Sequence, residues 1–358
     1  MKRMLRIKKT LNILVILCLS LSGLVACDNQ IDDWVDSLGD DDSIVCDDDT
    51  TTVVFKRVAY WSVSDDETLD DIDFSMLTHI IYNKIGIDSG GELSLPTGDD
   101  LDEFEEMIEL ADTAGIYAMV SIGNSSDTAF NAIAVDDDAL DNFRDNLEDL
   151  IDEYDLDGID INWQFPEGDD EGDLFEDLMK EMDDLATDEG ILLSYVVDTG
   201  QDDDATDDGV QDDVLGYGDF LNVMALDTSD YDDPLEDAEE AIEYWTDRCV
   251  VKNRLVLAIP VYSEGDAELD FSEIIDDDTS NACYDYASNV EDSDGNEYDD
   301  ITYNGIPTVT DKTEYAESYA GGVILTSLDQ DYLDEDSYSL LTTIYWQSYL
   351  AAPNDICD

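Results

Sequence analysis

Three polar side chains recur at every second position within residues 157–164. Asp160, Asn162 and Gln164 alternate there with apolar residues. A period of two is typical of a β-strand and places all three side chains on the same side of it. A buried carboxyl group and two amides in one column need hydrogen-bonding partners, which are either each other or a ligand. The column therefore predicts a polar binding or catalytic site, and the alternative is a polar plug that binds no ligand.

Eight short apolar segments, separated by amphipathic ones, predict the elements that position this column. The expected strands are residues 57–62, 78–85, 116–122, 157–164, 191–197, 220–226, 254–261 and 321–327. Eight strand–helix units predict an α/β protein with a parallel (β/α)8 TIM barrel, whose sites lie at the carboxyl ends of the strands. Because Asp160, Asn162 and Gln164 would line the barrel, Trp163 is expected to face outward and pack against helices.

Residues 262–320 are too many for a simple connection. They predict a small insertion between strands seven and eight, over the barrel mouth. Within it, Asp294 and Gly295 predict a hairpin turn. A calcium loop is the less favoured alternative, because the glutamate expected at loop position 12 is lacking.

The segment 157–164 resembles the signature of the family 18 glycoside hydrolases, Asp-x-x-Asp-x-Asp-x-Glu on the fourth strand. The resemblance covers roughly residues 55–345. Its further landmarks, in order, are Val58–Trp61, Thr78–Tyr82, Ser121–Asn124, Met224–Asp227, Pro260–Tyr262 and Gly321–Asp329. The resemblance implies the same barrel and a site for sugars that carry an N-acetyl group.

In that family the glutamate protonates the glycosidic oxygen, and the acetamido oxygen of the sugar attacks C1. The last aspartate of the signature orients the acetamide. Here Gln164 takes the place of the glutamate and Asn162 that of the aspartate. An amide cannot give up a proton at neutral pH, and losing a general acid costs about 10²–10⁴-fold in rate. Leu226 replaces the tyrosine that binds the acetamido oxygen, and Thr326 replaces a tryptophan beneath the sugar.

These replacements favour glycan binding over hydrolysis, because amides keep the hydrogen-bonding groups that suit sugars. The expected ligand is an N-acetylglucosamine-containing glycan of the chitin or N-glycan type. The candidate catalytic positions are Gln164, Asn162, Asp160 and Asp227. The candidate glycan contacts are Tyr60, Trp61, Tyr82, Met224, Tyr262 and Thr326.

Two alternatives remain for the function. One is a chitinase or endo-β-N-acetylglucosaminidase with altered or residual activity, for which Glu167 is the candidate acid. The other is an inactive barrel that binds proteins. No cofactor and no metal ion is expected at the site in any of these interpretations.

The first residues predict export and a lipid anchor. Basic residues precede the apolar stretch 11–24, and Leu24-Val25-Ala26-Cys27 resembles a bacterial lipobox. We expect residues 1–26 to be removed and Cys27 to carry a lipid that binds the chain to a membrane of the bacterial cell envelope, inner or outer. An ordinary secretory signal is the alternative. Residues 27–52 are expected to form an acidic tether, and residues 53–350 the barrel.

The chain holds 95 acidic and 14 basic residues, for a formal net charge of −81. Such a chain repels phosphate backbones, so nucleic acid is not expected as a partner. Self-repulsion of this size predicts a protein adapted to high salt, where counterions screen the charge, and an acidic protein of ordinary habitats is the alternative. Four cysteines, Cys46, Cys249, Cys283 and Cys357, allow two disulfides in three possible pairings.

Overall fold

The computed structural model describes residues 54–63, 69–124, 128–200, 209–229, 233–333, 335–350 and 354–357. The predicted signal peptide, the lipid-anchor residue Cys27, the acidic tether and Cys46 lie outside the described residues. Within the described part of the chain, no helix has the length and apolar character needed to cross a membrane.

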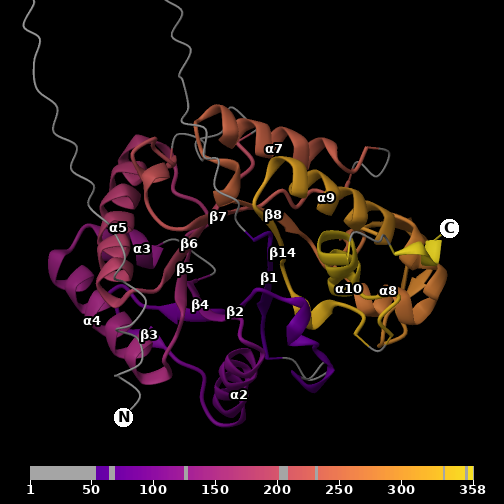
Figure 1. The fold of residues 1–358 in the computed structure, drawn as a ribbon, viewed down its shortest axis with the longest axis horizontal. Coiled ribbons are helices and arrows are strands. Elements are labelled where there is room, and N and C mark those ends of the chain that lie inside the picture. Colours follow the sequence, from indigo (N-terminus) through magenta and orange to yellow (C-terminus); the bar gives the residue numbers. More distant parts are fainter. Residues whose placement is uncertain are drawn as a thin grey trace, which may run out of the picture. The chain divides into compact units, whose positions relative to one another are not determined.

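Eight parallel strands form a closed ring (Figure 1). They are β1 (Lys56–Trp61), β2 (His79–Ile87), β4 (Tyr117–Gly123), β5 (Gly158–Asn162), β6 (Leu192–Val197), β7 (Phe220–Val223), β8 (Leu255–Ile259) and β14 (Gly322–Leu325). The ring closes because β1 pairs in parallel with both β14 and β2. Each of the eight predicted strands corresponds to one of these, so the predicted (β/α)8 barrel is confirmed. The short β3 (Leu93–Ser94) extends β2 in antiparallel pairing.

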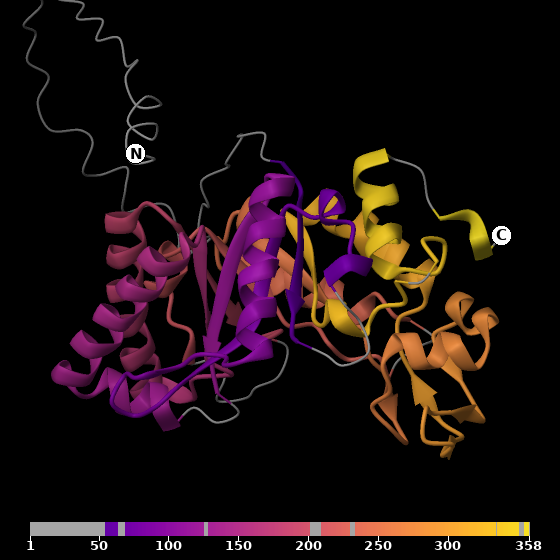
Figure 2. The ribbon, with the colours of Figure 1, turned by 90° about the horizontal axis from the view of Figure 1, so that it is seen from below.

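Helices surround the ring (Figures 1 and 2). The described helices include α2 (Asp99–Ala114), α3 (Thr128–Ala134), α4 (Asp137–Tyr154), α5 (Gly168–Glu189), α7 (Glu236–Asp247), α8 (Phe271–Asp277), α9 (Ile306–Tyr319) and α10 (Leu340–Tyr345). In α4 the apolar residues recur at helical spacing, so Phe143, Leu147 and Ile151 are buried on one face. The Asp136 carboxylate accepts hydrogen bonds from the first backbone N–H groups of α4 and thereby fixes its start.

Two apolar cores follow from the alternation of side chains along the strands. One lies between the strands and the helices and contains Trp163, whose ring stacks on Phe130 with centroids 5.1 Å apart and planes 3° from parallel. The outward orientation predicted for Trp163 is therefore confirmed. The second core fills the barrel interior and includes Tyr60, Ile81 and Met224.

The insertion after β8 contains five short strands and α8. The strands are β9 (Glu264–Gly265), β10 (Tyr286–Ala287), β11 (Val290–Glu291), β12 (Glu297–Tyr298) and β13 (Ile301–Thr302). Strands β11 and β12 form the hairpin predicted around Gly295, which adopts a positive φ of 84°. Thr228, which follows β7, donates its backbone N–H to Glu264 and its hydroxyl to the backbone oxygen of Thr302, so the insertion lies against the carboxyl end of the barrel (Figure 2).

A disulfide joins Cys283 in the insertion to Cys357 near the C-terminus. It links a 3₁₀-helix of the insertion, Thr279–Cys283, to the 3₁₀-helix Asp355–Cys357. Cys249 is also disulfide-bonded. Of the three pairings that the sequence allows, the structure therefore agrees with the one that joins Cys283 to Cys357.

Candidate functional site

The polar column of β5 lines the barrel from its interior to its mouth. Asp160 is completely buried, Asn162 at the end of β5 is 7% exposed, and Gln164 beyond it is exposed. Burial decreases along the column because each successive residue lies one step nearer the carboxyl ends of the strands. Gln164 therefore lies where a ligand could reach it, and Asn162 and the carboxyl group of Asp160 lie successively deeper beneath it.

Asp160 accepts four hydrogen bonds from four other strands. Tyr60 Oη and Ser121 Oγ each donate to Oδ2 at 2.8 Å. Ser194 Oγ and Asn222 Nδ2 donate to Oδ1 at 2.7 and 3.0 Å. Burial raises the pKa of the Asp160 carboxyl, and these hydrogen bonds oppose the rise because they favour the ionised form. Both carboxylate oxygens of Asp160 are thus hydrogen-bonded within the protein, and Asp160 links the strands across the barrel interior.

The layer above Asp160 contains buried acceptors without partners. Asn162 Oδ1 and Thr326 Oγ1 accept no hydrogen bond from the described residues, although both atoms are buried. Thr326 extends the pairing of β14 with β8, since its backbone N–H donates to Ile259 O at 3.2 Å. Strands β5 and β14 are four steps apart in either direction around the ring, so Asn162 and Thr326 lie on opposite walls of the barrel. Leaving such groups unpaired costs about 1–3 kcal/mol each.

Close packing between strands holds Asn162 in place. A Cβ atom on Gly123 of β4 would lie 2.5 Å from the backbone oxygen of Asn162, so only glycine fits there. The next residue, Asn124, bridges to β2. Its Oδ1 accepts from Ile87 N at 3.1 Å, and its Nδ2 donates to Ile87 O at 2.5 Å. Asn124 therefore joins β4 to β2 and serves the scaffold.

The residues after β7 divide between the interior and the surface. Met224 is buried in the interior core, and Leu226 packs against that core. Asp227 is exposed, and its Oδ1 accepts a hydrogen bond from Ser229 N at 2.7 Å. Tyr262, which follows β8, is half-buried, and burial raises the pKa of its hydroxyl to about 12. Of these residues, Asp227 and Tyr262 keep polar groups near the mouth.

Trp61 and Tyr82, two of the predicted glycan contacts, lie elsewhere. Both rings belong to the outer core, where their centroids are 6.1 Å apart, and Tyr82 also packs on Phe104 of α2 at 4.8 Å. Trp61 is 1% and Tyr82 8% exposed. The reason is the alternation itself, because Tyr60 faces inward and its neighbour Trp61 must face outward. This placement argues against a glycan contact for both rings. Tyr60, 3% exposed, supports Asp160.

The sequence interpretation missed three donors to Asp160, namely Ser121, Ser194 and Asn222. A signal for them exists, because each occupies an inward-facing position in the alternation of its strand. Strand register then brings Ser121 and Ser194 level with Asp160 on the two neighbouring strands.

The closed parallel barrel, with polar groups gathered at the carboxyl end of β5, defines a (β/α)8 barrel protein with a polar site at the carboxyl ends of its strands. The family model for glycosyl hydrolases family 18 matches residues 56–331. The match covers more than half of the chain, and the protein belongs to this family.

Relatives and solved structures agree with this assignment. A probable chitinase 10 of Drosophila melanogaster is 27% identical over 228 residues, which are 54% of this chain and 10% of the relative. A chitinase-like mite allergen of Dermatophagoides pteronyssinus is 25% identical over 237 residues, 60% of this chain and 48% of the relative. The chain thus spans between a tenth and about half the length of these curated relatives.

Solved family 18 chitinases share the fold. One from the chitin utilization locus of Flavobacterium johnsoniae has a TM-score of 0.69 and 22% identity, with 86% of this chain and 98% of that chain covered. A Cycas revoluta chitinase in complex with (GlcNAc)3 has a TM-score of 0.68 and 21% identity, with 82% and 99% covered.

Proposed function

We propose that the protein binds N-acetylglucosamine-containing glycans at the barrel mouth without hydrolysing them. The observation that carries the proposal is the pair of buried, unpartnered acceptors, Asn162 Oδ1 and Thr326 Oγ1, on opposite walls. An N-acetyl sugar offers an amide N–H and several hydroxyl groups, which are the donors that such atoms lack. The chitinase from Cycas revoluta bound to (GlcNAc)3 supports the same ligand class for this barrel.

The absence of turnover follows from the residue at the acid position. Gln164 is exposed at the mouth, where it can donate and accept hydrogen bonds, but its amide has no proton to transfer at neutral pH. Asp160 cannot replace it, because the Asp160 carboxyl is buried and all four of its donors come from the protein. Binding without catalysis is therefore the function that we assign to this site.

The proposal is tested by removing one unpartnered acceptor without changing the shape of the site. Thr326→Val replaces the buried hydroxyl with a methyl group of similar size. Because that hydroxyl has no partner among the described residues, the substitution should leave the free energy of unfolding unchanged or raise it. The same substitution should weaken the binding of chitotetraose about tenfold in isothermal titration calorimetry.

Two controls make this experiment specific. Thr310→Val removes a hydroxyl that bonds Ile306 O within α9, and it should not change the affinity for chitotetraose. Cellotetraose lacks the acetamido group and should bind more weakly than chitotetraose to the parent protein. Equal affinities of the parent protein and Thr326→Val for chitotetraose would argue against a role for this acceptor.

Hydrolysis through a substitute acid is the second candidate, and Glu167 is the residue that favours it. Glu167 is exposed at the start of α5, and its backbone N–H donates to the Glu171 carboxylate at 2.8 Å. It therefore lies beyond the strand, after Pro166. If the protein releases reducing ends from chitin oligosaccharides, Glu167→Gln should abolish that release, and release that survives the substitution excludes this route.

We also propose that a lipid on Cys27 keeps the binding site at the bacterial envelope. The support is the sequence Leu24-Val25-Ala26-Cys27 at the end of an apolar stretch. Metabolic labelling with a radioactive fatty acid should mark the parent protein, and Cys27→Ser should remove the label. Labelling that persists in Cys27→Ser would contradict a lipid at this position.

A further inference from the structure

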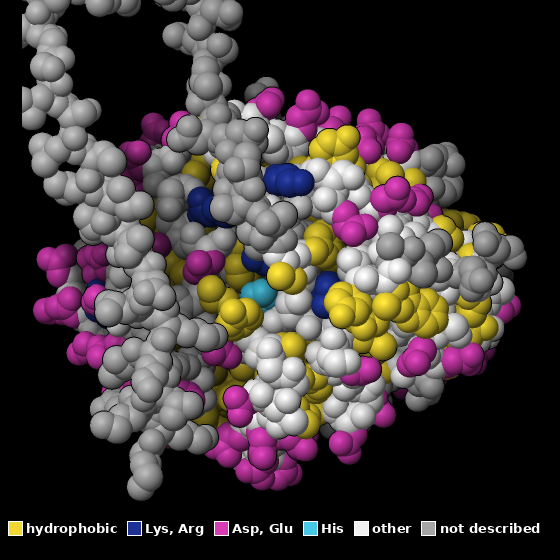
Figure 3. Space-filling view, viewed as in Figure 1, with side chains coloured by type: hydrophobic (Ala, Val, Ile, Leu, Met, Phe, Trp, Pro, Cys, Tyr) yellow, Lys and Arg dark blue, Asp and Glu magenta, His cyan; other side chains and the backbone are white. Residues whose placement is uncertain are grey.

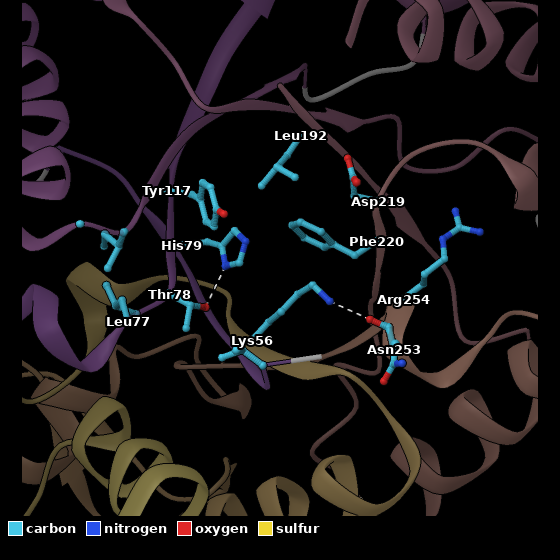
Figure 4. Close-up of a pocket in the computed structure, with 13 residues that line it drawn as sticks. Lys56, Leu77, Thr78, His79, Tyr117, Leu192, Asp219, Phe220, Asn253 and Arg254 are labelled. Atoms are coloured by element: carbon cyan, nitrogen blue, oxygen red, sulfur yellow. Dashed lines mark hydrogen bonds between the residues drawn. The ribbon is translucent and has the colours of Figure 1, made fainter. Parts of the chain in front are cut away.

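A cavity of about 580 Å³ opens at the end of the barrel opposite the mouth (Figure 4). Its walls are the first residues of several strands, among them Lys56 of β1, His79 of β2, Tyr117 of β4 and Phe220 of β7. The amino ends of the strands all meet at this end, so the cavity is separate from the glycan site. A volume of this size suits a small organic molecule.

The charge of this cavity is opposite to that of the chain. Acidic residues outnumber basic ones 95 to 14 in the sequence, yet the cavity is lined by Lys56 and Arg254 and by a single carboxylate, Asp219. One oxygen of this carboxylate is already hydrogen-bonded, because Asp219 Oδ2 accepts a hydrogen bond from the backbone N–H of Leu193 at 2.9 Å. Figure 3 shows Lys and Arg side chains around the single His on this face, among apolar side chains.

The ammonium group of Lys56 lines this cavity and makes few polar contacts with the described residues. Its Nζ donates one hydrogen bond, to the backbone oxygen of Asn253 at 2.7 Å, and lies 5.6 Å from the centre of the Phe220 ring. No carboxylate of the described residues forms an ion pair with it. Burial lowers the pKa of Lys56 to about 8, Asp219 opposes that fall and Arg254 adds to it. Two N–H donors of the ammonium group therefore remain for a ligand.

Arg254 is a second cation in the lining of the cavity, and it forms no ion pair with the described residues. Its guanidinium donates to the backbone oxygens of Leu215 and Tyr217, which carry no charge. Its Nε is buried and has no acceptor among the described residues. An anion beside Lys56 would therefore also be attracted by Arg254.

Aromatic rings form the apolar part of the cavity. The rings of His79 and Tyr117 stack with centroids 4.9 Å apart, and the Phe220 ring meets His79 edge-on at 5.5 Å. Tyr117 is 48% exposed, so one side of this stack is open. Burial and the charge of Lys56 lower the pKa of His79 to about 3, so at neutral pH the imidazole contributes surface and hydrogen bonding without charge.

We propose that this cavity binds a small organic anion, a carboxylate with an aromatic or aliphatic body. The carboxylate accepts hydrogen bonds from the Lys56 ammonium, and the body lies on the rings of His79, Tyr117 and Phe220. A charge-assisted hydrogen bond at a partly desolvated ammonium gives the selectivity for an anion, and the rings give the selectivity for an organic one.

The test compares benzoate with benzamide, which has nearly the same shape and no charge. In isothermal titration calorimetry at neutral pH and low salt, benzoate should bind saturably and at least about tenfold more tightly than benzamide. This comparison uses the full parent protein and needs no variant. Equal binding of the two compounds, or no saturable binding of benzoate at millimolar concentrations, would overturn the proposal.

A pair of variants then locates the site. Lys56→Gln should lower the affinity for benzoate about tenfold and leave that for benzamide unchanged. Lys252→Gln removes a nearby exposed ammonium that does not line the cavity, and it should leave both affinities unchanged. Circular dichroism establishes that Lys56→Gln is folded, and an unchanged benzoate affinity in the folded variant would place the anion elsewhere.

Discussion

The hydroxyl of Tyr60 donates a 2.8 Å hydrogen bond to the Asp160 carboxyl across the interior of the barrel, 100 residues apart in the chain. Both residues are buried, and the Asp160 carboxyl is the acidic member of the β5 column that the chain retains. The bond links β1 to β5, which are three steps apart around the ring. The interior of the barrel thus holds an intact polar network, and the residues of the column above it, Asn162 and Gln164, carry amide groups.

Removing this donor should destabilise the protein in a pH-dependent way. Tyr60→Phe loses a hydrogen bond to a carboxylate, which costs about 2 kcal/mol of unfolding free energy. Because burial raises the pKa of Asp160, ionised Asp160 destabilises the folded state as the pH rises through the raised pKa. Without the Tyr60 donor that pKa rises further, so the stability deficit of the variant should grow as the pH rises above the ordinary pKa of an aspartate, about 4. Urea unfolding at several pH values measures it.

The matched control for this prediction is Tyr195→Phe. The Tyr195 hydroxyl is also buried but donates to the neutral backbone oxygen of Val214 at 3.2 Å. Its loss should cost stability without adding any dependence on pH across the same acidic range. A deficit of Tyr60→Phe that stays constant with pH would contradict the coupling of Tyr60 to an ionised Asp160.

The ammonium of Lys312 offers a second test of buried charge. It is fully buried in α9, without a hydrogen-bond partner among the described residues, and burial lowers its pKa from 10.5 to about 8. Below about pH 8 the folded state therefore holds a costly charge, and stability should rise with pH between about 8 and 10.5. Lys312→Met should raise the unfolding free energy on the order of 3 kcal/mol at neutral pH and abolish that rise.

Lys180→Met, at an exposed position of α5, is the control for this substitution and should change stability by less than about 0.5 kcal/mol. Thermal and urea unfolding of the two variants at neutral and alkaline pH measure both effects. If Lys312→Met is less stable than the parent protein at neutral pH, attraction between the ammonium and the nearby carboxylates stabilises the folded state by more than burial of the charge destabilises it.

The disulfide between Cys283 and Cys357 should contribute strongly to stability. It closes a segment with a sequence separation of 74 residues, and a loop of that length corresponds to about 4 kcal/mol of lost entropy in the unfolded chain. The double substitution Cys283→Ala and Cys357→Ala should lower the unfolding free energy by about that amount. A loss below about 1 kcal/mol would indicate that the insertion and the C-terminal segment are held by other contacts.

Salt should stabilise the folded protein. With a formal net charge of −81, repulsion among carboxylates opposes the compact state, and counterions screen that repulsion. The urea midpoint should therefore rise as sodium chloride increases from low to molar concentrations. A midpoint that falls along this series would contradict adaptation to a salty environment.

The sequence predicts the barrel and the column at its mouth because both depend on local patterns. Each strand is an apolar run with a period of two, and the same period places Asp160, Asn162 and Gln164 on one wall. The same alternation indicates that the Tyr60 ring faces the barrel interior and the Trp61 ring faces the helices. Composition and family resemblance alone do not distinguish the two rings. The pairing of the four cysteines could not be predicted, because their spacing in the sequence does not determine disulfide connectivity.

Long-range geometry accounts for what the sequence did not predict. The four donors to Asp160 come from four strands, and they meet only after the strands have closed in a particular register. The cavity at the opposite end likewise joins Lys56, His79 and Phe220 across the ring. Each of these residues begins a strand, but nothing local in the sequence indicates that their side chains share one space.

We propose that the barrel mouth holds an N-acetylated glycan and leaves it intact. The most direct measurement incubates the parent protein with chitotetraose and follows both the heat of binding and the products by mass spectrometry. We predict saturable binding and no shorter oligosaccharide after prolonged incubation, with cleavage appearing when Gln164→Glu and Asn162→Asp restore the acid and its partner. Shorter products from the parent protein, or no binding at all, would contradict glycan binding without hydrolysis at this site.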